Sequence, residues 1–105
     1  MGRVRWTEKA SANLEAIFEY IAKDSRLYAA RYVKSLIRAT GKLEIVPFCG
    51  RVVPELDNPE LREVVFGNYR IIYRVLGKEQ SVQILAVVHG AREMKRTITE
   101  DWELG

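Results

Sequence analysis

The stretch from Leu61 to Arg92, LREVVFGNYRIIYRVLGKEQSVQILAVVHGAR, restricts the possible folds of this chain more than any other segment. Three runs rich in β-branched and aromatic residues are separated there by two tight-turn signals, Gly67-Asn68 and Gly77-Lys78-Glu79-Gln80. The glycine of the first turn supplies the positive φ that a two-residue hairpin needs. The stretch therefore predicts antiparallel strands over residues 61–66, 69–76 and 81–88.

Alternation divides the middle strand of this set into two faces. Tyr69, Ile71, Tyr73 and Val75 share one face, while Arg70, Ile72, Arg74 and Leu76 share the other. The strand over residues 81–88 is apolar at nearly every position, which favours a central place in the sheet. Helices packed on one face would leave the arginine-bearing face partly open to solvent or to a partner.

The residues before the sheet predict a short strand and two helices. Arg3 to Trp6 alternate as a half-buried strand does, and Thr7 is suited to cap the helix that follows. Asp24 and Ser25 offer a stop and a new cap, so the two helices form an antiparallel hairpin that Pro47 ends. One side of each helix is apolar at helical spacing, at positions 10, 14, 17, 18 and 21 in the first and at positions 29, 33, 36, 37 and 43, together with Thr40, in the second. Gly41 weakens the last turn of the second helix.

The second helix carries Arg31, Lys34, Arg38 and Lys42 on the side away from its apolar residues. Such a row is compatible with a polyanion contact and equally with a solvated surface. Residues 47–59, PFCGRVVPELDNP, read as an irregular loop that packs onto the domain, and long ordered loops are often functional. Cys49 has no nearby cysteine or histidine partner, which favours an inert thiol and no metal site.

Composition sets the class of protein. A chain of 105 residues with 48% apolar and 30% charged residues has room for one folded domain, here residues 1–105. It lacks an apolar run that could serve as a signal peptide or membrane helix, and its lone cysteine fits a reducing compartment, so a cytoplasmic protein without a membrane partner is expected. The net charge of +3 is a mild basic bias.

Several segments resemble, in the right order, the RelE/ParE superfamily of type II toxins. They are WTEKA before the first helix, the loop GRVVPEL, the hairpin LREVVFGNYRIIYRV and the ending VQILAVVHGAR. The resemblance implies an α+β fold of order β-α-α-β-β-β, in which an N-terminal strand and a two-helix antiparallel hairpin accompany a small, mainly antiparallel sheet. The pattern of the residues predicts the same fold.

The superfamily contains two activities. RelE-like members cut mRNA on the ribosome without a metal, which requires a base, cationic groups on the phosphate and an acid. Arg70 matches the sheet arginine used on the scissile phosphate, Arg92 resembles a second one, and His89 could transfer a proton. The lysines of the nuclease branch are replaced by Arg62-Glu63-Val64, and its late tyrosine is missing.

The resemblance therefore implies a ParE-like toxin that inhibits DNA gyrase by binding, uses no cofactor, and serves in growth arrest and plasmid stabilisation. A cognate antitoxin, disordered when alone, would neutralise it in a hetero-oligomer through an acidic amphipathic segment laid over the helices and the exposed sheet. The alternatives are a ribosome-dependent mRNA endonuclease and a member that retains antitoxin binding alone. The candidate contacts for the target or antitoxin are Arg62, Arg70, Arg74 and Arg92.

Two structural alternatives remain open at this point. Arg70 could pair with Glu63 or Glu55 inside the molecule, and His89 could donate a hydrogen bond that closes the end of its strand.

Overall fold

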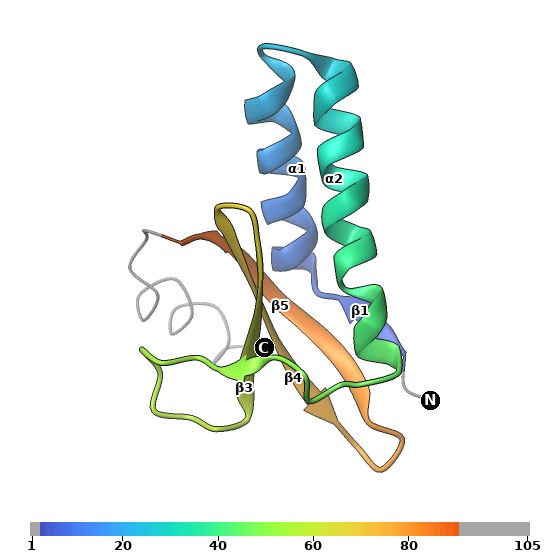
Figure 1. The fold of residues 1–105 in the computed structure, drawn as a ribbon, viewed down its shortest axis with the longest axis vertical. Helices are drawn as coiled ribbons and strands as arrows, with labels where there is room; N and C mark the ends of the chain where they lie inside the picture. The colour runs from blue at the N-terminus through green and yellow to red at the C-terminus, as the bar shows by residue number, and fades with distance from the viewer. Residues whose placement is uncertain (1–2, 91–105) are drawn as a thin grey trace.

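The structure is a computed structural model that describes residues 3–90 of the chain, and it confirms the predicted α+β fold (Figure 1). Its five strands form one sheet in the order β1-β5-β4-β3-β2, in which β1 is parallel to β5 and every other pair is antiparallel. In chain order the elements are β1 (Val4–Trp6), α1 (Glu8–Ala22), α2 (Arg26–Ala39), the 3-10 helix η1 (Gly41–Glu44), β2 (Arg51–Val52), β3 (Leu61–Phe66), β4 (Tyr69–Leu76) and β5 (Ser81–His89).

The two helices begin at the predicted caps. The Thr7 hydroxyl accepts a hydrogen bond from the Ala10 amide, and the Ser25 hydroxyl accepts one from the Tyr28 amide. The second helix ends earlier than predicted, because α2 stops at Ala39 and the tighter η1 turn takes over at Gly41. Glycine at that position is unfavourable inside an α-helix, which accounts for the early end.

The helix hairpin packs on one face of the sheet and extends past it at one end (Figure 1). The predicted division of β4 is confirmed, since Ile71 and Tyr73 lie in the core under the helices and Ile72 lies in a second cluster on the opposite face. The helix-side core also contains Ala10, Ile17, Leu36, Leu43, Val64, Val82, Ile84 and Val87. Strand β5 is interior as predicted, although β4 is the middle strand.

The face opposite the helices is covered in part by the loop between β2 and β3. Val53 is fully buried there and Leu56 packs against the same cluster, whose members on the sheet are Leu61, Ile72, Leu85, Ala86 and Val88. The loop was predicted to be irregular throughout, and the two-residue strand β2 within it is an addition to that prediction. No helix in residues 3–90 has both the length and the apolar character needed to cross a membrane.

Strand β5 contains a β-bulge in the middle of its pairing with β4. Ile72 lies opposite Ala86 and Tyr73 lies opposite Ile84, so Leu85 is an extra residue on β5. Leu85 and Ala86 consequently both pack in the cluster opposite the helices. From Ala86 onward, each β5 side chain points to the face opposite to the one that strict alternation from Ser81 would give it.

Candidate functional site

Arg70 is the centre of a buried ion network on the face opposite the helices. Its Nε and Nη2 lie 2.7 and 2.6 Å from Glu63 Oε1, and its Nη1 and Nη2 donate to the two oxygens of Glu55 at 2.6 Å each. The Arg51 guanidinium, on β2, donates to the other oxygen of Glu63. Arg70 therefore pairs with both acids that the sequence offered as partners, and each of its guanidinium nitrogens is engaged inside the molecule.

The four side chains of this network are buried to different extents. The Glu63 side chain is 0% exposed and that of Arg70 is 8% exposed, whereas those of Glu55 and Arg51 are 43% and 62% exposed. The expectation that Arg70 lies on an exposed strand face is thus wrong. Two buried opposite charges with their hydrogen bonds satisfied stay together, because separating them would leave an unpaired charge in the interior.

Arg70 and Glu55 shift each other's pKa. Hydrogen bonds from Arg70 are the main cause that lowers the pKa of the Glu55 carboxyl from its ordinary 4.5 to about 2. The hydrogen bond with Glu55 is likewise the main cause that raises the pKa of Arg70 above its ordinary value, against the effect of burial. Both groups are therefore ionised throughout the neutral range.

Glu55→Gln is expected to flatten the acid side of the stability curve. Because the folded pKa of Glu55 lies below the unfolded value, the stability that this carboxylate contributes is complete above pH 4.5 and is lost as the pH falls towards 2. The contribution is at most about 1 kcal/mol, since solvent screens a partly exposed carboxylate. Thermal melting between pH 7 and pH 2 measures it.

Glu60→Gln is the control for this measurement. Glu60 lies in the same loop and has no ion pair in the part of the chain that the structure describes, so this variant should follow the wild-type curve. An acid limb that is the same in wild type and Glu55→Gln would mean that the Glu55–Arg70 contact does not persist in solution.

Two further arginines predicted as contacts, Arg62 and Arg74, also have partners within the chain. Arg62 donates from Nη1 to the Gly50 carbonyl at 2.8 Å and stacks over the Phe48 ring, so it holds the segment that enters β2. Arg74 is half-buried and donates from Nε to Gln83 Oε1 at 2.8 Å on the face opposite the helices. Contact of either residue with a target or an antitoxin stays a prediction, and Arg92 lies outside the described residues.

His89 lies on the helix side of the sheet, at the end of β5. Its ring meets the Tyr69 ring edge to face, with the centroids 5.6 Å apart. Tyr69 and His89 are directly paired across β4 and β5, whereas Arg70 is paired with Val88. Because of the bulge at Leu85, His89 and Arg70 point to opposite faces of the sheet. A hydrogen bond that closes this strand end runs from the Gly90 amide to the Asn68 carbonyl, at 2.8 Å.

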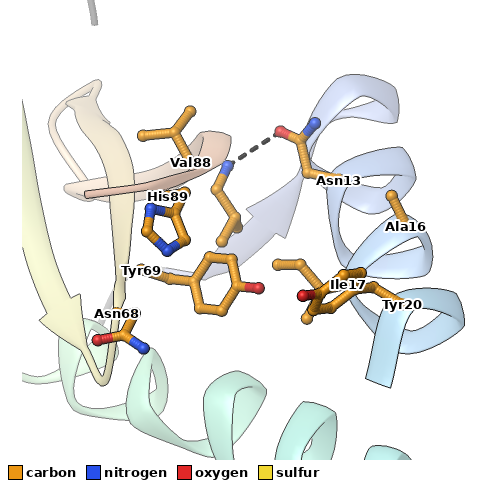
Figure 2. A pocket seen from close by; sticks show the side chains of 9 residues that line it. Asn13, Ala16, Ile17, Tyr20, Asn68, Tyr69, Val88 and His89 are labelled. Atoms are coloured by element: carbon orange, nitrogen blue, oxygen red, sulfur yellow. Dashed lines mark hydrogen bonds between the residues drawn. The ribbon is translucent and has the colours of Figure 1, made fainter. Parts of the chain in front are cut away.

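A groove of about 610 Å³ opens beside His89, between α1 and the paired ends of β4 and β5 (Figure 2). Tyr20 lines it from α1, while Tyr69 and His89 line it from the sheet. Asn13 joins the two walls, because its side-chain oxygen accepts a hydrogen bond from the Val87 amide at 3.0 Å. The groove thus offers aromatic surface and polar edges together, which is suited to binding rather than to phosphate chemistry.

Residues of both the ion network and the groove have no signal in the sequence. Arg51 reaches Glu63 because the two lie opposite each other in the β2–β3 pair, and β2 itself has no recognisable strand pattern. The groove depends on Asn13 and Tyr20, which fall off the apolar stripe of the first helix and carry no signal of their own. Within residues 3–90, no cluster of three or more His, Cys, Asp and Glu side chains could hold a metal ion.

Comparison with known proteins identifies relatives over most of the chain. The family model described as the ParE toxin of the type II toxin–antitoxin system parDE matches residues 4–94. A curated candidate toxin from Sinorhizobium fredii, Y4kP, is 33% identical over 98 residues, which cover 91% of this chain and 96% of the relative.

Solved structures share the fold. The chromosomal ParDE toxin–antitoxin system of Pseudomonas aeruginosa contains a chain with a TM-score of 0.71 and 26% identity, over 85% of this chain and 96% of that one. The toxin–antitoxin complex RelBE2 of Mycobacterium tuberculosis contains one with a TM-score of 0.63 and 23% identity, over 84% and 96% of the respective chains.

Proposed function

This chain belongs to the ParE toxin family of type II toxin–antitoxin systems, within the RelE/ParE superfamily, and we propose that it arrests growth by binding and inhibiting DNA gyrase. The proposal requires a stable binding surface and no turnover. The burial of Arg70 and its pairing with carboxylates favour a ParE-like activity over a RelE-like one.

The observation that carries the proposal is the closed ion network around Arg70. A nuclease of the RelE type needs cationic groups that are free to stabilise charge on the phosphate in the transition state. In this chain Arg70 is buried and held by two carboxylates, and one of them, Glu63, occupies the strand that bears lysines in the nuclease branch. A phosphate approaching Arg70 would meet two negative charges.

A second observation supports binding over cleavage. The two described residues of the set proposed for catalysis do not converge, since His89 and Arg70 point to opposite faces of the sheet. Proton transfer and phosphate stabilisation must act on the same reacting atoms, so their side chains need to converge.

We also propose that a cognate antitoxin neutralises this toxin in a hetero-oligomer. The structural relatives include toxin–antitoxin complexes, which supports such a partner. A segment that folds on binding needs apolar surface to cover. Large apolar side chains are exposed at the tip of the helix hairpin and before β2, namely Tyr20, Leu27, Tyr28, Ile45, Val46 and Phe48.

A supercoiling assay with purified gyrase tests the target. Saturating toxin is expected to stop supercoiling of relaxed plasmid or to trap cleaved DNA, and addition of the antitoxin should restore activity. Supercoiling that proceeds at the normal rate with saturating, folded toxin would remove gyrase as the target.

The runner-up is a ribosome-dependent mRNA endonuclease, for which the exposed position of His89 beside the groove is the favourable observation. Primer extension on mRNA after brief induction of the toxin separates the two activities. Codon-phased cuts would favour the nuclease, and their absence together with inhibited gyrase is expected. A protein that arrests neither growth nor gyrase would be a member that retains antitoxin binding alone.

A further inference from the structure

The positive charge of this chain is concentrated in one segment. Between Asp24 and Glu44 there is no acidic residue, and the segment carries the five cations Arg26, Arg31, Lys34, Arg38 and Lys42. The whole chain has 17 Lys and Arg against 14 Asp and Glu, so the rest has 12 cations and 14 acids, a net charge of −2. The basic character of the protein thus comes entirely from α2 and the turn after it.

Three of these cations form a row on the solvent side of α2, here called the α2 ridge: Arg31, Lys34 and Arg38. All three are exposed, and they lie opposite Ala29 and Leu36, which are fully buried against the rest of the domain. Their spacing of three and four residues places them about 5–6 Å apart along a helix that rises 1.5 Å per residue. None of them has an ion pair within residues 3–90.

Exposed cations without internal partners at this spacing fit a polyanion with regularly repeated charges. We propose that the α2 ridge binds the phosphate backbone of duplex DNA without reading its sequence. Duplex DNA presents one phosphate per about 3.4 Å of each strand, so a straight row of arginine and lysine side chains can neutralise several phosphates at once.

The surroundings of the ridge favour a duplex over a single strand. Proteins that bind single strands usually stack bases on exposed aromatic rings between their cations. The aromatic residue between the cations of the ridge, Tyr32, is turned inward, where its ring packs against those of Phe66 and Tyr69 at centroid distances of 5.4 and 6.2 Å. The exposed Tyr28 lies before the ridge, in the first turn of α2. The exposed side chains between Arg31 and Arg38 are otherwise small or aliphatic.

The surroundings also favour DNA over an acidic protein helix. Such a helix buries a continuous apolar seam alongside its ion pairs. On α2 the exposed large apolar side chains are separated, since Leu27 and Tyr28 lie in the first turn and Ile37 lies near the end. The cations occupy the surface between them, which leaves phosphate contacts as the main source of affinity.

This inference goes beyond inhibition of gyrase, since it needs no gyrase to be observed. Fluorescence anisotropy of a labelled duplex of arbitrary sequence, titrated with the full chain at several salt concentrations, tests it directly. With three phosphates neutralised, the logarithm of the binding constant should fall with the logarithm of salt concentration with a slope of about −2.7.

The matched variants are two triple substitutions that remove the same charge. Arg31→Gln/Lys34→Gln/Arg38→Gln, in which glutamine preserves helix propensity, should weaken DNA binding at least about tenfold and flatten the salt slope. Arg3→Gln/Arg5→Gln/Lys78→Gln changes three exposed cations elsewhere and should keep most of the affinity and the slope. Circular dichroism verifies that both variants are folded.

Three results would overturn the proposal. They are no binding of wild type to DNA at low salt, equal binding by wild type and the ridge variant, and an equal loss in the two triple variants. Single-stranded RNA and a polyglutamate peptide serve as competing probes. Ridge-dependent binding of either one in preference to duplex DNA would assign the ridge to that class of partner instead. The supercoiling assay measures gyrase inhibition independently of this titration. DNA binding by the α2 ridge and inhibition of gyrase can therefore each be disproved without the other.

Discussion

Arg70→Ala is expected to lower the free energy of unfolding by about 3–5 kcal/mol. The substitution leaves Glu63, whose side chain is 0% exposed, with Arg51 at the surface as its remaining ionic partner. A buried carboxylate that loses its closest cation pays the cost of desolvation without the attraction that offset it. Urea denaturation near neutral pH measures the loss as a change in midpoint.

Arg51→Ala is the control for this prediction. Its guanidinium contacts the same carboxylate of Glu63 but is 62% exposed, so its removal should cost about 0–1 kcal/mol. If Arg51→Ala and Arg70→Ala lowered the free energy of unfolding equally, the conclusion that burial makes the Arg70–Glu63 pair the stronger one would be contradicted. A loss of toxicity in Arg70→Ala is then explained by stability, and it would not identify Arg70 as a catalytic residue.

Gly50→Ala is expected to destabilise the protein by about 3 kcal/mol or more. A Cβ at this position would lie 2.6 Å from the Glu63 carbonyl oxygen and 2.6 Å from the Tyr73 hydroxyl. The carbonyl belongs to the sheet and cannot yield cheaply. The hydroxyl accepts a hydrogen bond from the Gly50 amide at 2.9 Å and donates one to the Pro47 carbonyl at 2.7 Å, so displacement would leave buried polar groups without partners.

Gly41→Ala provides the matched control. A Cβ on Gly41 would meet nothing within 4 Å, and the residue lies in a helical turn. Alanine is favoured over glycine there, so the change should be neutral or stabilising by up to about 1 kcal/mol. Thermal unfolding measures the stability of the two variants. A comparable loss of stability in both would show that the close approach at Gly50 is relaxed in solution.

The sequence predicted the elements whose signals are local. The cap residues Thr7 and Ser25, the Gly67-Asn68 turn and the alternation in β4 each depend on a few neighbouring residues, and all are confirmed. The short strand β2 was missed because two residues carry no periodicity. Its pairing with β3 depends on where the long loop returns.

The arrangement of the candidate site was harder to predict, because it depends on distant contacts. Glu63 and Glu55 were both possible partners of Arg70, and spacing alone could not say that Arg70 takes both and becomes buried. The grouping of Arg70 with His89 came from the family resemblance, and the bulge that turns them to opposite faces has no signal in the sequence. The groove forms only where α1 packs on the ends of β4 and β5, and no local sequence pattern indicates that packing.

The extra residue at Leu85 has a consequence for how this chain should be aligned with its relatives. A relative without a bulge at this point aligns correctly on both halves of β5 only if a one-residue gap is placed there. An ungapped alignment that matches residues 81–84 would, from Ala86 onward, equate side chains from opposite faces of the sheet. Roles assigned to the histidine from such an alignment would describe a different surface of the molecule.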